Sequence, residues 1–134
     1  MLLLRIPHDF AVLLSRALSN LLLNAHESAP GRPIDVVVNG RSDRVEIEIL
    51  DRGPGLPEDL RGRLFEPYVS TKKRGSGLGL SLVRDIARQH RGSASLEPRT
   101  EGGARALLIL PRDPENVPPG LAPPPGGEPL DARA

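Results

Sequence analysis

The chain has 134 residues, with 18 Lys and Arg against 17 Asp and Glu, and its formal net charge is therefore +1. This length corresponds to one domain, and the near-zero charge argues against a general binder of nucleic acid or acidic membranes. Two Phe, one Tyr and no Trp exclude aromatic stacking platforms and ligand cages, and the absence of Cys excludes disulfides and thiolate chemistry. The apolar run at residues 1–4 and the two longest runs, at 10–14 and 106–110, are too short to span a membrane, so we expect no membrane contact by this chain.

Apolar spacing predicts the elements of the first half of the chain. Residues 2–6 are expected to form a short strand that ends at Pro7, and residues 9–28 a helix with Asp9 as its N-cap. The apolar stripe of this helix, which Leu22 widens, consists of Leu14, Leu18, Leu21 and Ala25. Residues 34–39 and 44–50 alternate apolar and polar side chains, which predicts an antiparallel hairpin with one buried face.

The second half begins with a long loop. Residues 51–79 carry glycines at both ends and prolines between them, so we expect a loop with one helical turn near 58–64, and loops of this length are usually functional. Residues 80–90 predict a second helix, and residues 93–97 and 104–110 predict a second hairpin. This order of elements predicts an α+β fold, with helices on one face of a sheet.

The end of the chain differs from the rest in composition. Eight of the 15 prolines lie in residues 111–134, which show no apolar period. We therefore expect a folded domain over residues 1–110 and a disordered tail over 111–134.

Three motifs combine residue types that suit a nucleotide. Asn20 and Asn24 lie one helical turn apart, and their amide oxygens could bind Mg²⁺, although such a pair is more often solvated. Asp51 follows a strand and precedes two glycines, which suits a hydrogen bond to an exocyclic amine but also an ordinary turn. The glycines of residues 75–79 precede a helix, where backbone N–H groups favour phosphate.

Together these motifs resemble the ATP-binding catalytic domain of sensor histidine kinases. Asn20-Leu-Leu-Leu-Asn24 resembles its asparagine box, and Asp51-Arg-Gly-Pro-Gly55 its first glycine box. Leu64-Phe-Glu-Pro-Tyr68 resembles its phenylalanine box, and Gly75-Ser-Gly-Leu-Gly79-Leu80 its second glycine box. Ser70-Thr71-Lys72 resembles the nitrogen-regulation type of sensor kinase. The order and spacing of the four boxes agree with the family over residues 9–110.

The resemblance implies a fold, two cofactors and roles for individual residues. The implied fold is a two-layer sandwich of the Bergerat type, with a mixed sheet of about five strands and about three helices on one face. ATP and Mg²⁺ are the implied cofactors: Asn24 would hold Mg²⁺ with help from Asn20, and Asp51 would bind the adenine amino group. Residues 56–76 would form a lid over ATP. Asn20 and Lys72 are the implied catalytic residues, and the implied nucleotide-binding residues are Asn20, Asn24, Asp51, Gly53, Gly55, Phe65, Thr71, Lys72, Gly75, Ser76, Gly77, Leu78, Gly79 and Leu80.

The implied activity is transfer of the ATP γ-phosphate to a histidine on a separate dimerisation domain, in cis or in trans, with a response regulator downstream. The motif around His8 breaks at Ala11 and Val12, and His8 lies on the same helix as Asn20, so it is not expected to be the phosphoacceptor. The module is therefore expected to be inactive alone and cytoplasmic, whether or not the parent kinase is anchored in a membrane. His90 is expected to be a cation at a helix C-terminus, and His26 to lie on the surface.

Two other classes of the same superfamily stay open as alternatives. One is a stand-alone anti-sigma-type serine kinase, and the other is an ATP-hydrolysing protein of the gyrase and heat-shock chaperone type. The resemblance implies that proteins of both classes carry Glu at the position of Asn20. An amide cannot take a proton at neutral pH, so Asn20 argues against both alternatives.

Overall fold

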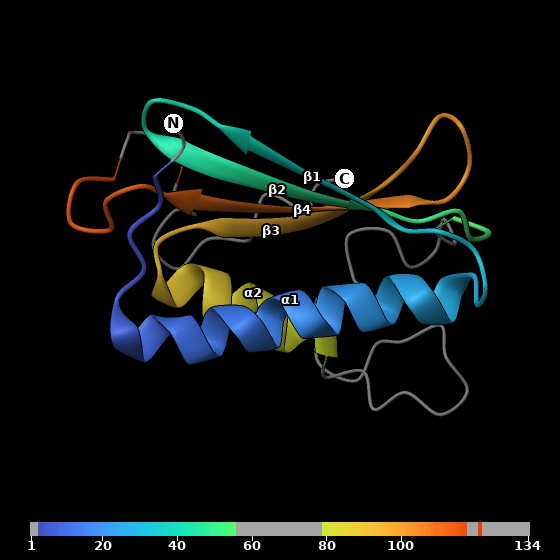
Figure 1. Cartoon of the computed structure of the whole chain (residues 1–134), viewed down its shortest axis with the longest axis horizontal. Coiled ribbons are helices and arrows are strands. Elements are labelled where there is room, and N and C mark those ends of the chain that lie inside the picture. The colour runs from blue at the N-terminus through green and yellow to red at the C-terminus, as the bar shows by residue number, and fades with distance from the viewer. Residues whose placement is uncertain (1–2, 56–78, 118–120, 122–134) are drawn as a thin grey trace.

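The computed structural model describes residues 3–55, 79–117 and 121. Its elements, in chain order, are α1 (His8–Ser28), β1 (Asp35–Gly40), β2 (Arg44–Leu50), α2 (Gly79–Gln89), β3 (Ser93–Pro98) and β4 (Ala104–Pro111). They form two layers, with both helices on one face of an antiparallel sheet (Figure 1). The predicted α+β sandwich is confirmed.

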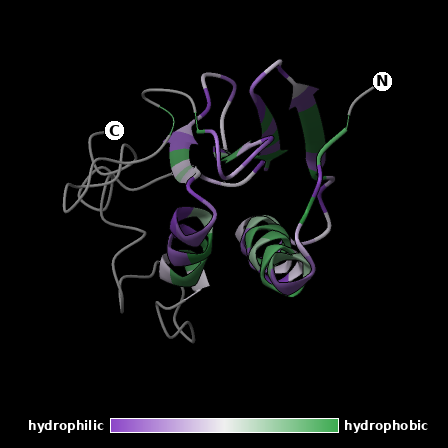
Figure 2. Cartoon of the chain, turned by 90° about the vertical axis from the view of Figure 1, so that its left-hand side faces the viewer, coloured by the Kyte–Doolittle hydropathy of each residue, from purple (hydrophilic) through white to green (hydrophobic). Residues whose placement is uncertain are grey.

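The core lies between the two central strands and the helices. The strand order is β1-β2-β4-β3, and β2 pairs with β4 along its whole length. Alternate residues of β2 point toward the helices and stand beside their β4 partners, and all of them are buried: Val45 with Leu110, Ile47 with Leu108, and Ile49 with Ala106. Figure 2 views the two layers end-on, with α1 and α2 side by side beneath the sheet. Because side chains alternate between the two faces of a strand, every second residue of β2 and β4 contributes to the sheet side of the core.

The helices close the core from below. α1 buries Phe10, Leu14, Ala17, Leu21 and Ala25, which recur at helical spacing, and α2 buries Val83, Ile86 and Ala87. Leu22, expected to widen the stripe of α1, is 40% exposed instead, because it lies on the flank of the helix away from α2. Among the described residues, no helix is long and apolar enough to cross a bilayer.

The start of α1 differs from the expectation in two ways. The helix begins at His8 with Pro7 at its N-cap, and Asp9 lies in the first turn without capping it through its side chain. A carboxylate in the first turn still suits the helix dipole. Of the strand predicted over residues 2–6, residues 3–6 are described and are not in a strand, and the carbonyl oxygen of Leu3 accepts a hydrogen bond from Arg112 Nη1 (2.9 Å).

The predicted hairpin of β1 and β2 exists, but only β2 has a buried face. Val36, Val37 and Val38 of β1 are 52%, 36% and 51% exposed. The register places Val36 beside Ile49 and Val38 beside Ile47, so both point to the helix side of the sheet. The expected burial of β1 is wrong, because α1 packs beneath β2 and does not extend under the edge strand.

The described part of the chain has four strands, all antiparallel, and two helices, where a mixed sheet of about five strands and three helices was expected. The predicted helical turn near 58–64 lies outside the described residues. At the C-terminal side, β4 extends to Pro111, one residue beyond the predicted domain boundary, and Leu121 is buried. Residues 112–117 of the predicted tail are also described, and the backbone N–H of Arg112 donates to the carbonyl of Asp43 (3.0 Å). Residues 118–120 and 122–134 lie outside the described ranges, and the disorder predicted for them stays a prediction.

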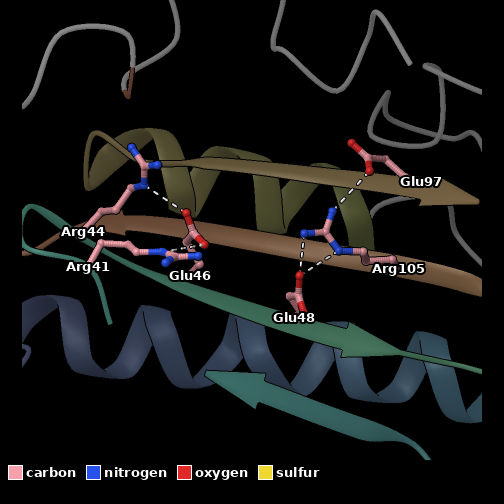
Figure 3. Close-up of polar contacts among 6 residues, drawn as sticks. All are labelled: Arg41, Arg44, Glu46, Glu48, Glu97 and Arg105. Atoms are coloured by element: carbon pink, nitrogen blue, oxygen red, sulfur yellow. Dashed lines mark hydrogen bonds and ion pairs between the residues drawn. The ribbon is translucent and has the colours of Figure 1, made fainter. Parts of the chain in front are cut away.

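The outer face of the sheet carries two groups of ion pairs (Figure 3). Arg105 of β4 bridges Glu48 of β2 and Glu97 of β3. At the other end, Arg44 and Arg41 both pair with Glu46, and the hydrogen bond from Arg44 lowers the pKa of that carboxyl group below its ordinary value. Pairs this close to solvent each contribute about 0.2–1 kcal/mol, so they fix side-chain positions more than they stabilise the fold.

His90 does not have the role expected of it. It follows α2 and is 5% exposed, with its ring stacked on Phe10 of α1 at a centroid distance of 3.8 Å. Burial lowers the pKa of His90, against the opposing effect of the Asp9 carboxylate. The histidine is therefore a neutral packing residue between the two helices and not a cation at a helix end, whereas His26 is exposed, as expected.

Candidate functional site

The candidate site begins where β2 ends, at Asp51. Asp51 is 4% exposed, and its carboxylate Oδ1 accepts hydrogen bonds from the backbone N–H groups of Gly53 (3.0 Å) and Ala104 (3.0 Å). Among the described residues, these hydrogen bonds use Oδ1 alone. The two donors fix the plane of the carboxylate, and Oδ2 is then the oxygen that can accept a hydrogen bond from a ligand.

Asp51 also occupies the last rung of the β2–β4 ladder. Its backbone N–H donates to the carbonyl of Ala104 (3.0 Å), as expected of the residue that follows the Leu50–Arg105 pair. The return bond from Ala104 goes to the side chain of Asp51 and not to its carbonyl oxygen. That carbonyl oxygen accepts a hydrogen bond from Arg99 Nη1 (2.8 Å) instead. The site is thus part of the hydrogen-bonding pattern of the sheet.

Gly53 is held against the end of α1. A Cβ at Gly53 would lie 2.8 Å from Ser28 Cβ and 3.0 Å from the Ser28 carbonyl oxygen. A side chain would therefore push the turn away from the helix, so the turn after Asp51 requires glycine here. On its other side the turn meets the β3–β4 hairpin, because a Cβ at Gly55 would lie 3.6 Å from the carbonyl oxygen of Gly103.

The two asparagines lie along α1, on the flank that faces α2. Asn24 is one turn before Ser28, whose hydroxyl donates to the Asn24 carbonyl (3.1 Å). Asn20 is one turn further, and its Nδ2 is 3.4 Å from the carbonyl oxygen of Gly79, where α2 begins. Eight residues of helix separate Asn20 from Ser28, a rise of about 12 Å. α1 therefore links the Asp51 turn, at its C-terminal end, to the start of α2, which it contacts at Asn20.

Two arginines and one glycine that sequence reasoning did not assign to the site also hold it. Arg52 donates to the Pro33 carbonyl (2.6 Å) and pairs with Asp35 (2.9 Å), which ties the turn to the start of β1. Arg99 and Gly103 hold Asp51 from the facing hairpin. The only sequence signal for these contacts is the pair of glycines at 102–103, which marks a turn but does not show what the turn contacts.

The described part of the chain thus places the predicted site residues in two groups. Asp51, Gly53 and Gly55 form the turn after β2, with Gly53 against Ser28. Asn20 contacts Gly79 at the start of α2, next to Leu80, which packs at the edge of the core, and Asn24 lies on α1 between the two groups. The predicted residues that lie outside the described ranges are Phe65, Thr71, Lys72, Gly75, Ser76, Gly77 and Leu78. Their roles stay predictions.

The described residues fit the two groups that the sequence implies. A buried carboxylate with one oxygen already bound to two backbone N–H groups offers the other to an amine at a defined angle. The glycine turn beside it allows close approach of a flat ring. The side-chain oxygens of Asn20 and Asn24, one turn apart, are the hard ligands that suit Mg²⁺ with a phosphate.

Comparison with known proteins agrees with this geometry. Residues 10–114 match the family model described as histidine kinase-, DNA gyrase B- and HSP90-like ATPase. The chain is 42% identical over 107 residues to nitrogen regulation protein NtrY of Azorhizobium caulinodans, covering 73% of this chain and 14% of NtrY. It is 36% identical over 112 residues to the C4-dicarboxylate transport sensor protein DctS of Rhodobacter capsulatus, covering 80% of this chain and 17% of DctS. The chain thus spans less than a fifth of these curated relatives.

Solved structures resemble the same part of the chain. The catalytic domain of histidine kinase ThkA superposes with a TM-score of 0.70 at 31% identity, covering 78% of this chain and 69% of that one. The mycobacterial sensor histidine kinase MprB superposes with a TM-score of 0.68 at 30% identity, covering 75% of this chain and 70% of that one. The chain therefore belongs to the family of histidine kinase-, DNA gyrase B- and HSP90-like ATPases, as an ATP-binding domain of the kind found in sensor histidine kinases.

Proposed function

We propose that this chain is the catalytic domain of a sensor histidine kinase of the nitrogen-regulation type, and that it transfers the γ-phosphate of ATP to a histidine on a dimerisation domain. The observation that carries the proposal is the clamped carboxylate of Asp51, which is buried at the end of β2 and held through one oxygen by two backbone N–H groups. The relatives with the same domain, NtrY and DctS, are regulatory and sensor proteins by name, which supports the same conclusion.

In this proposal Asp51 recognises the adenine base of ATP. Its Oδ2 accepts the hydrogen bond of the exocyclic amino group of adenine, which guanine does not present at that position. Gly53 and Gly55 leave room for the ring next to the carboxylate, since the turn is already pressed against Ser28 on one side and the Gly103 carbonyl on the other. Selectivity for adenine thus follows from the fixed orientation of Asp51 Oδ2, which can accept a hydrogen bond from an amino group but not from a carbonyl.

The phosphate end of the site would lie along α1, beyond Asn24. Asn24 and Asn20 supply side-chain oxygens for Mg²⁺, which would neutralise phosphate charge when bound. The contact between Asn20 and the first residue of α2 supports an amide pair near the N-terminus of that helix. An N-terminus of this kind favours anions, so phosphate and metal would meet where α1 and α2 approach each other.

The lid and the second glycine box lie outside the described ranges, and the phosphoacceptor lies on another domain. Phe65, Thr71 and Lys72 would belong to a lid over ATP, with Lys72 as the cation at the γ-phosphate, and Gly75, Ser76, Gly77 and Leu78 would donate backbone N–H groups to phosphate or approach it closely. The phosphoacceptor domain would act in cis or in trans, a response regulator would receive the phosphoryl group, and the domain would work in the cytoplasm.

Asn20 distinguishes this proposal from a hydrolase or an anti-sigma-type serine kinase. By the family resemblance, proteins of those two types carry a glutamate base at that position. The amide of Asn20 cannot remove a proton from water or from a serine hydroxyl. We therefore expect tight ATP binding with slow hydrolysis by the isolated chain.

Two measurements on the purified chain test the proposal. Calorimetric titration with ATP and Mg²⁺ should show binding, and incubation with labelled ATP should label a separately added dimerisation domain of a nitrogen-regulation kinase but not the chain itself. The control is the same incubation with a dimerisation domain whose phosphoacceptor histidine is replaced by Gln. Rapid multiple-turnover phosphate release without an acceptor would contradict the kinase proposal and favour a hydrolase.

A further inference from the structure

The last rung of the β2–β4 ladder has an unusual exchange of acceptors. In an antiparallel hydrogen-bonded pair, each residue donates its N–H to the carbonyl of the other. At Asp51 the donation to Ala104 is regular, but Ala104 donates to the Asp51 carboxylate. The carbonyl oxygen of Asp51 is therefore displaced from the ladder, and a buried backbone oxygen of this kind needs another donor.

Arg99 supplies that donor from the β3–β4 hairpin. Its Nη1 lies 2.8 Å from the Asp51 carbonyl oxygen, and its Nη2 pairs with Glu101 (3.1 Å). The Arg99 side chain is only 15% exposed, so the guanidinium is held between these two acceptors. The backbone of Arg99 belongs to the same turn, since its N–H donates to the Gly103 carbonyl (3.0 Å) and its carbonyl accepts from Gly102 (3.2 Å).

We propose that Arg99 is a positioning residue for adenine recognition. Because Arg99 holds the Asp51 carbonyl oxygen, that oxygen does not accept the N–H of Ala104, and the Asp51 carboxylate accepts it instead. This hydrogen bond to Oδ1 sets the direction of Oδ2. The inference rests on the proposed function of Asp51 as the adenine acceptor. Without the guanidinium, the Asp51 carbonyl can return to Ala104, and the carboxylate loses one of its two backbone donors. Arg99 itself touches no ligand in this account and acts through Asp51.

The test compares Arg99→Met with the wild-type chain and with Arg112→Met as a matched control. Arg112 makes the same kind of contact, from a guanidinium to the backbone carbonyls of Leu3 and Arg41, but at the opposite end of the sheet. ATP and inosine triphosphate, which carries a carbonyl in place of the adenine amine, are titrated into each variant. Amide hydrogen exchange is followed at Gly53 and Ala104 in the absence of nucleotide.

If the inference is right, Arg99→Met weakens ATP about tenfold, the factor that corresponds to 1.4 kcal/mol, and lowers the ratio of ATP to inosine triphosphate affinity. The amide of Gly53, which then remains as the carboxylate's only backbone donor, exchanges faster than in the wild type, while the amide of Ala104 stays protected by the Asp51 carbonyl. Arg99→Lys recovers part of the affinity, and Arg112→Met changes neither selectivity nor exchange at Gly53.

Loss of stability in Arg99→Met with an unchanged affinity ratio and unchanged exchange at Gly53 would overturn the inference, because Arg99 would then only tie the hairpin together. A wild-type chain that does not bind ATP would instead refute the proposed function. In that case the exchange at Gly53 still decides whether Arg99 holds the Asp51 carboxylate in the ladder.

Discussion

Replacing Gly103 by Ala is expected to damage the domain far more than the same replacement at its neighbour Gly102. Both glycines have positive φ angles, +87° and +95°, so Ala meets comparable backbone strain at the two positions. They differ in what a new Cβ would meet. At Gly102 nothing lies within 4 Å, whereas at Gly103 the Cβ would lie 2.9 Å from the carbonyl carbon of Asp51, closer still to its oxygen, and 3.1 Å from Oδ1.

These contacts set the size of the difference. A left-handed backbone costs Ala about 1–2 kcal/mol, and Ala recovers about 0.4–1 kcal/mol by restricting the unfolded chain, so Gly102→Ala should cost about 1 kcal/mol. Gly103→Ala adds the overpacking of a methyl group against a backbone, about 1–3 kcal/mol. Relief of the clash must separate the hairpin from Asp51, so the bonds from Ala104 and Arg99 to Asp51 weaken as well.

Thermal unfolding and ATP titration of the two variants measure both consequences. We expect the midpoint temperature to fall by about 4 °C for each kcal/mol lost. Gly102→Ala should bind ATP like the wild type, while Gly103→Ala should bind it more weakly, even at temperatures where the variant remains folded. If the two variants lose the same stability and both keep the wild-type affinity, the close approach of the hairpin to Asp51 does not support the site.

Three further predictions address the site and the core. Asp51→Asn should weaken ATP by about 1.5–3 kcal/mol, because a charged acceptor is lost, and weaken inosine triphosphate much less in the same calorimetric titration. Asn20→Glu should raise slow phosphate release measurably, since it restores a base at that position, and unchanged release would show that the water is not held there. The lowered pKa of His90 means that the folded state binds fewer protons than an unfolded histidine with a pKa of about 6.5, so this stabilisation is complete above pH 6.5 and is lost as the pH falls toward the folded pKa. Urea unfolding between pH 8 and 5 should show that loss in the wild type and a smaller one in His90→Phe, which keeps an aromatic ring against Phe10.

The sequence predicted the parts of the site that local patterns encode. Asp51 and its glycines form a motif that can be read within five residues, and the spacing of Asn20 and Asn24 places both on one flank of a helix. Arg99 could not be assigned in this way, because its contact with Asp51 joins residues 48 positions apart and depends on how β2 and β4 pair. The same holds for the clash that requires glycine at position 53, since Ser28 approaches it only in the folded chain.

The fold was predictable in class and in most element bounds, and the failures concern what covers each element. Alternation in β1 indicates a strand but does not show whether a helix lies beneath it, and α1 lies beneath β2 instead. Similarly, the position of His90 just after a helix predicts a cation that interacts with the helix dipole. The structure instead buries His90 against Phe10, which lies some 80 residues earlier in the chain. In each case a partner distant in sequence outweighs a local preference.

The uncovered valines of β1 bear on how the domain behaves in concentrated solution. In the described sheet β1 is an outermost strand, and its six residues, Asp35–Gly40, contain neither Lys nor Pro, the residues that most often block sheets from joining edge to edge. Val36 and Val38 add apolar surface on the helix side of that edge. Two copies that meet antiparallel about Val37 would place Val36 opposite Val38 and Asp35 opposite Asn39, without opposing like charges. We therefore expect this edge to promote association of the isolated chain at high concentration, and a single charge introduced at Val37 to reduce that association.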